Sequence, residues 1–185
     1  MSAPAPESRL AELPGDLMIW VLIVSELLVF GAGIVAFLAV RTTDVVGFAE
    51  AQDLLDRTAG GINTAVLVTS GLCAALASRL RLAERRLAAR LWLGAAGLLG
   101  GLFLWVKAVE YEAKVSAGIG TETHPFFTFY YLLTGFHAAH VVAGIIILAL
   151  IAWRDSPRNL ESGTAFWHMV DLVWILLFPV IYLLR

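Results

Sequence analysis

The chain has 185 residues, of which 59% are hydrophobic and 15% are charged, and its mean hydropathy is +0.81. A single soluble domain of 20.0 kDa cannot bury that much apolar surface, so the composition indicates an integral membrane protein. The net charge of -2 gives no basic face for nucleic acid, and the one cysteine, Cys73, has no partner for a disulfide within the chain. We therefore expect one membrane domain over residues 1–185 and no nucleic-acid partner.

Hydrophobic segments predict an all-α bundle of five transmembrane helices, because about 20 apolar residues in a helix cross the hydrocarbon core of a bilayer. Residues 1–16 are rich in alanine, proline and charge, which predicts a flexible amino-terminal tail. We expect residues 41–60 to form an exposed loop with a short surface helix, and residues 154–163 to form a turn. The predicted spans are 17–40, 62–78, 91–109, 126–153 and 164–184.

The connection from Arg79 to Arg90 contains five arginines and one acidic residue. Short cytoplasmic loops carry an excess of lysine and arginine, so this connection is expected to be cytoplasmic. The amino-terminus and the turn at 154–163 then share the cytoplasmic side, and the carboxyl-terminus is external. Eight lysines and arginines fall on the predicted inner side and five on the outer side.

The third predicted span carries a series of small residues, Gly94, Gly97 and Gly101, which we expect to allow close approach of neighbouring helix backbones. At its external end three polar residues share one helix face, because they are spaced i, i+3 and i+4. They form either an interface pair whose lysine snorkels to water or a defined polar site. These residues are Lys107, Glu110 and Tyr111.

Besides Lys107 at the end of the third span, five ionisable residues lie inside the predicted spans: Glu26, His137, His140, His168 and Asp171. An ionisable side chain at the bilayer centre costs on the order of 2.5 to 3.5 kcal/mol on insertion scales, so each should face protein, a headgroup or water. Glu26, His140 and Asp171 fall at depths within the cytoplasmic half of the membrane. A desolvated carboxylate is stabilised by an imidazole donor, so we expect a hydrogen bond from a histidine to Glu26.

Three functional interpretations fit these polar residues. Three histidines and two carboxylates are ligand types for iron, copper or zinc, although a pair at i and i+3 is a weak signal. Intramembrane acids are also typical of a free-standing proton or solute transporter. The third interpretation is an interaction subunit, whose polar residues hold its own helices together and bind lipid against a larger partner.

Four motifs resemble subunit III of the haem-copper oxidases, in its five-helix bacterial form. The first is WVLIVSELLVFGAGIVAF at 20–37, and the second is KAVEY at 107–111. The third is TGFHAAHVVAG at 134–144, which matches the family pattern Thr-Gly-x-His-x-x-His-Val-x-x-Gly. The fourth is FWHMVDLVWILLFPVIYL at 166–183, which is similar to the closing helix of the family.

The resemblance implies a non-catalytic accessory subunit of a respiratory complex in the bacterial inner membrane. It implies no haem or metal in this chain, and a partner, subunit I, that carries haem with copper or iron. Family members hold phospholipid in a cleft and support the assembly, stability, and lipid, oxygen and proton access of the catalytic subunit. The membrane-embedded, carbodiimide-reactive glutamate of the family maps onto Glu26. His137 and His140 become structural residues that pack and hydrogen-bond to neighbouring helices.

The chain departs from the family pattern at several positions. Leu27, Leu28 and Val29 partly replace phenylalanines, Ala138 stands where glycine is common, and Pro179 is unusual in the last helix. These substitutions, with the opening LPGDLMIW, resemble the NorE-like proteins found with bacterial nitric oxide reductases. The resemblance therefore leaves two parent complexes open, an oxygen-reducing oxidase and a nitric oxide reductase.

Overall fold

The computed structural model describes residues 17–154 and 157–184, so the predicted tail at 1–16 lies outside the described residues. The elements of the described chain are helices. Five of them are long and apolar enough to cross a membrane, as predicted from the sequence. All the helical elements of the described chain, in order, are α2 (Leu17–Arg41), α3 (Val45–Asp53), α4 (Arg57–Leu82), α5 (Arg86–Ser116), α6 (Pro125–Arg154), α7 (Pro157–Phe178) and the π-helix η1 (Pro179–Leu183).

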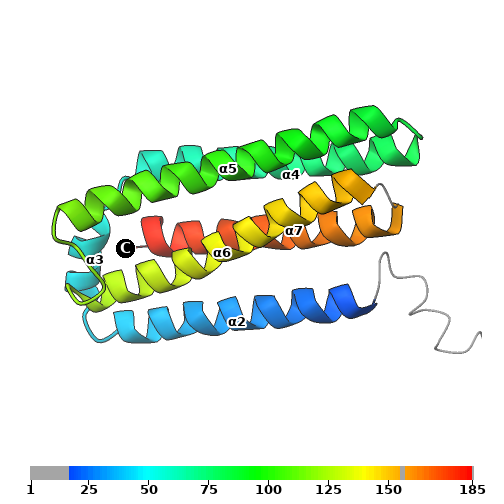
Figure 1. Cartoon of the computed structure of the whole chain (residues 1–185). Coiled ribbons are helices and arrows are strands. Elements are labelled where there is room, and N and C mark those ends of the chain that lie inside the picture. The colour runs from blue at the N-terminus through cyan, green and yellow to red at the C-terminus, as the bar shows by residue number, and fades with distance from the viewer. Residues whose placement is uncertain (1–16, 155–156, 185) are drawn as a thin grey trace, which may run out of the picture.

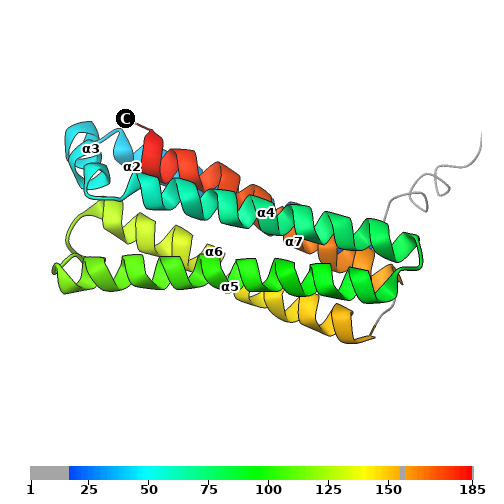
Figure 2. The ribbon, with the colours of Figure 1, turned by 90° about the horizontal axis from the view of Figure 1, so that it is seen from above.

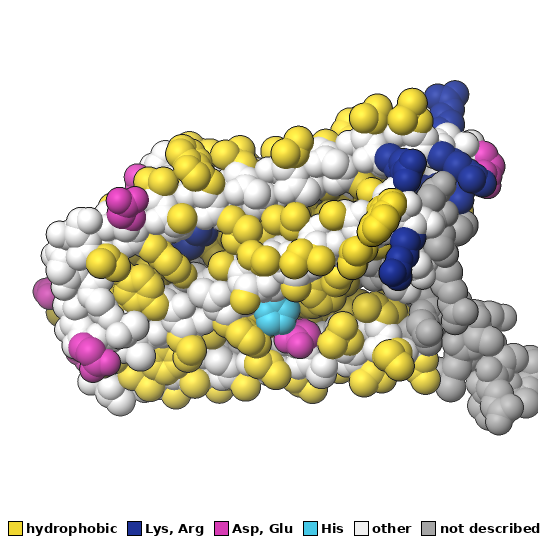
Figure 3. All heavy atoms as spheres, in the orientation of Figure 1, with side chains coloured by type: hydrophobic (Ala, Val, Ile, Leu, Met, Phe, Trp, Pro, Cys, Tyr) yellow, Lys and Arg dark blue, Asp and Glu magenta, His cyan; other side chains and the backbone are white. Residues whose placement is uncertain are grey.

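The five long helices run up and down along one axis in three layers (Figures 1 and 2). α4 and α5 form one layer, α6 and α7 form the middle layer, and α2 packs on the other side of α6 and α7. The start of α2, the α4–α5 turn, the end of α6 and the start of α7 lie at one end of the bundle, while α3 and the end of η1 lie at the other. Figure 3 shows lysine and arginine side chains gathered at the first of these ends.

Several helix boundaries differ from those predicted. α4 and α5 extend through most of the arginine-rich connection and leave only the turn 83–85, where Glu84 has a φ of 58°. Gly60 and Gly61, expected in a loop, lie inside α4 because Asp56 caps that helix by accepting a hydrogen bond from the Ala59 amide at 2.9 Å. Residues 157–163, expected in a turn, already belong to α7, because a proline suits the first position of a helix.

The short helix α3 is a packed element rather than part of an exposed loop. Asp44 caps it by accepting a hydrogen bond from the Gly47 amide at 3.0 Å. Phe48 and Gln52 are both 2% exposed, so the inner face of α3 closes this end of the bundle. The short helix expected within residues 41–60 is therefore confirmed, whereas the exposure expected for this segment was wrong for the inner face of α3.

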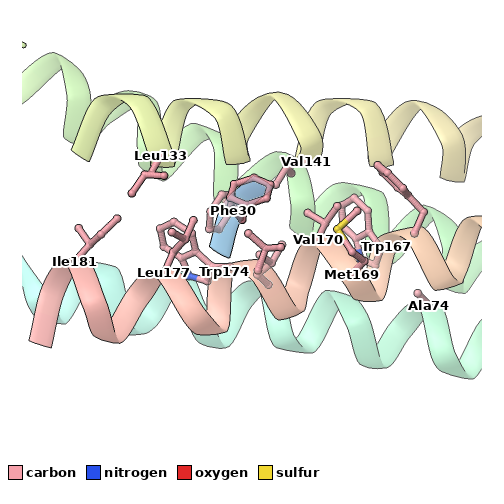
Figure 4. Close-up of a cluster of buried hydrophobic side chains, with 14 of the residues drawn as sticks. Phe30, Ala74, Leu133, Val141, Trp167, Met169, Val170, Trp174, Leu177 and Ile181 are labelled. Atoms are coloured by element: carbon pink, nitrogen blue, oxygen red, sulfur yellow. The ribbon is translucent and has the colours of Figure 1, made fainter. Parts of the chain in front are cut away.

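The core of the bundle is built around Trp167 on α7, whose side chain is fully buried (Figure 4). Its indole lies between two glycines, since a Cβ added at Gly100 of α5 or Gly144 of α6 would lie 2.7 Å or 2.5 Å from the ring. The indole nitrogen donates to the Ser70 hydroxyl of α4 at 3.1 Å, and that hydroxyl donates to the Ala96 carbonyl of α5 at 2.7 Å. One tryptophan therefore connects four helices.

The glycine series predicted to bring helices together does not do so within this chain. A Cβ added at Gly94, Gly97 or Gly101 would meet nothing within 4 Å, so these residues lie on the open face of α5. Close approach occurs instead at Gly100, which belongs to a different face of the same helix. The spacing was recognisable in the sequence, but the rotation of the helix about its axis was not.

Pro179 ends the regular hydrogen bonding of α7, because it lacks an amide hydrogen, and the chain continues as the π-helix η1. The Leu184 amide donates to the Pro179 carbonyl at 2.9 Å, and Gln52 of α3 donates from Nε2 to the Ile181 carbonyl at 2.8 Å. The buried side chain of Gln52 thus satisfies a backbone carbonyl of the irregular segment. This contact joins α3 to the last element of the chain.

Candidate functional site

The polar residues inside the spans form one closed cluster and two pairs. The cluster is centred on Lys107, which is 3% exposed. Its Nζ lies 3.0 Å from Glu110 Oε2 and donates to the hydroxyls of Tyr130 at 3.1 Å and Tyr182 at 2.9 Å. Both hydroxyls in turn donate to the Glu110 carboxylate, at 2.9 Å and 2.8 Å. Charge and hydrogen-bonding capacity are therefore matched within the cluster.

Aromatic rings surround the same ammonium group. Nζ lies 4.7 Å from the ring centre of Tyr130, 5.0 Å from that of Tyr111 and 5.6 Å from that of Trp174, which are distances at which a cation and a π face attract. The Tyr111 hydroxyl is 2.5 Å from the Thr134 hydroxyl on α6. Of the two interpretations of this segment, the snorkelling interface lysine is wrong, because Nζ is enclosed by rings from three helical elements and points into the bundle.

The sequence alone did not reveal Tyr130, Trp174 or Tyr182 as members of this cluster. Each lies on another helical element. The two residues whose hydroxyls accept from Lys107, Tyr130 and Tyr182, are 23 and 75 residues away from it along the chain. The only sign of these partners in the sequence was that tyrosines occur on other predicted helices near the membrane depth of Lys107 and Glu110. Depth brings residues to one level, but only the packing of α6 and η1 against α5 brings them into contact.

The first pair joins Glu26 of α2 to His140 of α6, and it confirms the expected hydrogen bond between Glu26 and a histidine. Glu26 Oε2 lies 3.1 Å from His140 Nε2, and the other ring nitrogen, Nδ1, lies 2.9 Å from the Phe136 carbonyl. A carbonyl accepts only, so Nδ1 is the donor in the contact to Phe136. The side chains are 21% and 15% exposed, which places the pair at the membrane-facing surface between the two helices.

His137 contributes packing rather than hydrogen bonds. Its ring is fully buried, stacks on Trp174 at 5.1 Å between ring centres, and meets Phe103 edge-on at 5.5 Å. Neither ring nitrogen has a hydrogen-bond partner among the residues that the structure describes. The expectation that both histidines hydrogen-bond to neighbouring helices therefore holds for His140 and was wrong for His137, because one turn of the helix carries one ring to the surface and the other into the core.

The second pair lies on α7. His168 Nδ1 is 3.8 Å from Asp171 Oδ2, a distance that allows an electrostatic contact but exceeds that of a hydrogen bond. The His168 side chain is 45% exposed, whereas that of Asp171 is 9% exposed. Asp171 lies twelve residues from each end of the apolar helical segment Asn159–Leu183.

The positions of the histidines and carboxylates decide whether they can bind a metal ion together. Within the described residues, no group of three or more histidine, cysteine or carboxylate side chains is placed to hold a metal ion. Glu26 and His140 come together, His137 stands apart in the core, and His168 with Asp171 forms a separate pair. The arrangement is that of a multi-pass membrane bundle in which polar side chains connect helices.

Comparison with known proteins gives the family. Residues 16–185 match the family described as Cytochrome c oxidase subunit III, and the chain belongs to this family. The resemblance in the four motifs is therefore confirmed.

Individual relatives align along most of their length. The chain is 28% identical over 192 residues to cytochrome c oxidase subunit 3 of Bacillus sp. (strain PS3), covering 98% of this chain and 92% of that protein. It is 29% identical over 174 residues to the Bacillus subtilis protein of the same description, covering 89% and 84%. It is 27% identical over 173 residues to the cytochrome bo(3) ubiquinol oxidase subunit 3 of Pseudomonas aeruginosa, covering 89% and 82%.

Proposed function

We propose that this chain is the non-catalytic subunit III of an oxygen-reducing haem-copper oxidase in a bacterial inner membrane. The observation that carries the proposal is the family match over residues 16–185, which includes all five spanning helices. The named relatives belong to cytochrome c and ubiquinol oxidases, which supports oxygen rather than nitric oxide as the gas that the complex reduces. Its partner is then a haem-bearing catalytic subunit that also holds copper.

The role proposed for the chain is to support the assembly, stability and lipid, oxygen or proton access of that catalytic subunit. Its internal contacts suit a supporting role, because Trp167 and the Lys107 cluster connect helices and leave little room for movement between them. A membrane-facing pocket of about 270 Å³ between α2, α6 and α7 has apolar walls from Ile19 and Ile147, with Arg154 at its edge. We propose that part of one phospholipid acyl chain occupies this pocket, with the phosphate of that lipid near Arg154.

Purification of the tagged chain in a mild detergent tests the proposal. We expect a multi-helix haem protein to co-purify, with haem absorption and consumption of oxygen on addition of a reduced quinol or cytochrome. Consumption of nitric oxide without oxygen would favour the alternative parent complex. A tagged chain that purifies without a haem protein, or that itself holds stoichiometric haem or metal, would overturn the proposal.

A substitution at Glu26 separates a supporting role from a catalytic one. Glu26→Gln keeps the shape of the side chain and a hydrogen-bonding partner for His140. We expect the complex to assemble with the haem spectrum of the partner unchanged, and any effect to be confined to the number of turnovers before inactivation. Loss of the haem spectrum would contradict the supporting role.

The proposed orientation places the arginine-rich end in the cytoplasm and the carboxyl-terminus outside. Seven arginines lie in the helix ends and the turn at that end of the described chain, which supports this assignment under the positive-inside rule: Arg79, Arg81, Arg85, Arg86, Arg90, Arg154 and Arg158. Cysteines placed at Glu84 in the α4–α5 turn and at Thr121 in the opposite loop test it, in a Cys73→Ser background. An impermeant maleimide added to intact spheroplasts should label the second cysteine and spare the first, and the reverse pattern would invert the orientation.

A further inference from the structure

A groove runs along the membrane-facing side of the bundle between α4 and α7. Its volume is about 350 Å³, and its walls are mostly apolar, with Leu72 on one side and Leu172 on the other. These two side chains are 59% and 43% exposed, so they project from the surface rather than into the core. His168 and Asp171 also line the groove, which makes it a polar interruption in an apolar face.

The carboxylate in this groove has less hydrogen bonding than its position requires. Asp171 Oδ1 is buried and has no hydrogen-bond partner among the described residues, and Oδ2 has only the long contact to His168 Nδ1 at 3.8 Å. A buried polar group without partners is costly, and more so near the centre of a bilayer, where water cannot compensate. The carboxylate therefore needs a donor from outside the chain.

The carboxylate of Asp171 packs directly against the backbone of α4 at the edge of the groove. Gly71 lies opposite Asp171, and a Cβ at that position would clash with Oδ2 and lie 3.6 Å from His168 Nδ1. Glycine at this point provides the space that the carboxylate occupies, and any other residue would displace it from the wall of the groove. The position of the carboxylate is thus a property of the sequence of both helices.

Depth distinguishes the possible occupants of the groove. Asp171 is twelve residues from each end of its span, which is about 18 Å of helix on either side. Lipid headgroups lie at the interfaces, outside a hydrocarbon core of about 30 Å, so their amines and hydroxyls do not reach this level. A transmembrane helix carries side-chain donors at any depth, and polar side chains of that kind hydrogen-bond across helices in membranes.

Two other carboxylates within the spans, Glu110 and Glu26, have hydrogen-bond partners inside the described chain. Glu110 accepts hydrogen bonds from Lys107 and two tyrosines, and Glu26 is paired with His140. Asp171 is thus the intramembrane carboxylate of the described chain that lacks a hydrogen bond. Two carboxylates are therefore hydrogen-bonded within the bundle, and the third lines a groove. A donor on a partner helix would supply the hydrogen bond that the third one lacks.

We propose that the groove between α4 and α7 is the docking surface for a transmembrane helix of the catalytic subunit, and that this helix presents a hydrogen-bond donor to Asp171. The inference rests on the proposed function, because it assumes that such a partner exists. It adds the face of the bundle, the residues that form it and the chemistry of the partner side chain. Leu72 and Leu172 would pack against the apolar side chains on either side of that donor.

Two matched tryptophan substitutions test the surface by retention of haem protein on the tagged chain. Leu72→Trp places a large side chain in the groove, and Leu98→Trp places the same side chain on the open face of α5, where Leu98 is 78% exposed. We expect Leu72→Trp to reduce retained haem protein at least tenfold and Leu98→Trp to leave it within twofold of wild type. The opposite pattern, or equal retention, would overturn the proposal.

Asp171→Ala separates a docking role from an internal structural one, because it removes the carboxylate without adding bulk against Gly71. Because Asp171 makes no hydrogen bond within the described chain, its replacement should leave the melting temperature of the isolated chain unchanged or higher, while retained haem protein falls at least tenfold. A lower melting temperature with full retention would refute the docking role. A wild-type chain that retains no haem protein would refute the proposed function itself, which is a different outcome from failure of the groove variants alone.

Discussion

The packing of Trp167 between two glycines gives the sharpest stability prediction. In Gly144→Ala the new Cβ would lie 2.5 Å and 2.6 Å from two carbons of the indole ring, whereas carbon atoms in good contact are about 3.5 to 4.0 Å apart. The ring must therefore move by about 1 Å. The ring cannot shift toward α5, because it already packs against the backbone at Gly100, where an added Cβ would lie 2.7 Å from the ring. Its nitrogen also donates a hydrogen bond to Ser70.

Overpacking of this kind costs about 1 to 3 kcal/mol. Alanine in place of glycine within a helix recovers about 0.5 to 1 kcal/mol, so the middle of the two ranges gives a net loss of about 1 kcal/mol for Gly144→Ala. For a chain of this size, 1 kcal/mol corresponds to about 2 to 4 °C in melting temperature, so we expect a decrease of about 2 to 4 °C.

Gly97→Ala is the matched control, because a Cβ there meets nothing within 4 Å and only the gain in helix propensity remains. Its melting temperature should equal or exceed that of wild type. Thermal unfolding of the detergent-solubilised chain, followed by tryptophan fluorescence, measures both variants. If Gly144→Ala melts at or above the temperature of Gly97→Ala, the argument that Trp167 is clamped between two helix backbones is refuted.

Three further predictions concern contacts away from that tryptophan. Lys107→Met should destabilise the isolated chain by about 3 kcal/mol, because it leaves the buried Glu110 carboxylate without its cation, and the double variant with Glu110→Gln should recover part of the loss in the same melting assay. Gln52→Leu should lower stability by about 1 to 2 kcal/mol, since the Ile181 carbonyl loses its donor, and unchanged melting would show that the contact is dispensable. The Gly47 amide and then His124 hold the pKa of the Asp44 carboxyl below its usual value. The stabilisation by the ionised carboxylate is therefore present above the pKa of the unfolded chain and is lost as pH falls through the lowered folded pKa. The melting difference between wild type and Asp44→Ala should shrink below about pH 4.

The spanning helices were predictable because apolar length is a local property of the sequence. Boundaries were less so, since caps such as Asp56 extend helices into segments whose composition suggests a loop. The pairing of Glu26 with a histidine followed from depth, because depth along a helix is also read from the sequence.

Contacts that depend on helix rotation and on distant partners were not predictable. Gly97 and Gly100 are three residues apart, yet one faces open space and the other faces Trp167, and no local signal separates them. The surroundings of Lys107 depend on Tyr182, which is 75 residues away on a π-helical segment that follows Pro179. The sequence placed Lys107, Glu110 and Tyr111 on one helix face, but it did not show which residues of the other helices contact them.

The three intramembrane carboxylates differ in which groups hydrogen-bond to them, and this difference predicts which property of the protein each replacement changes. Glu110 is enclosed with a lysine and two hydroxyls, so its replacement should act on the stability of the chain itself. Glu26 is satisfied by His140 at a partly exposed surface, so its replacement should act on events at the membrane face and leave the fold intact. Asp171 is not satisfied within the described chain, so its replacement should act on association alone. Measuring isolated-chain stability, turnover lifetime and retained haem protein on conservative variants at the three positions would separate these roles, because each variant is expected to change one quantity and spare the other two.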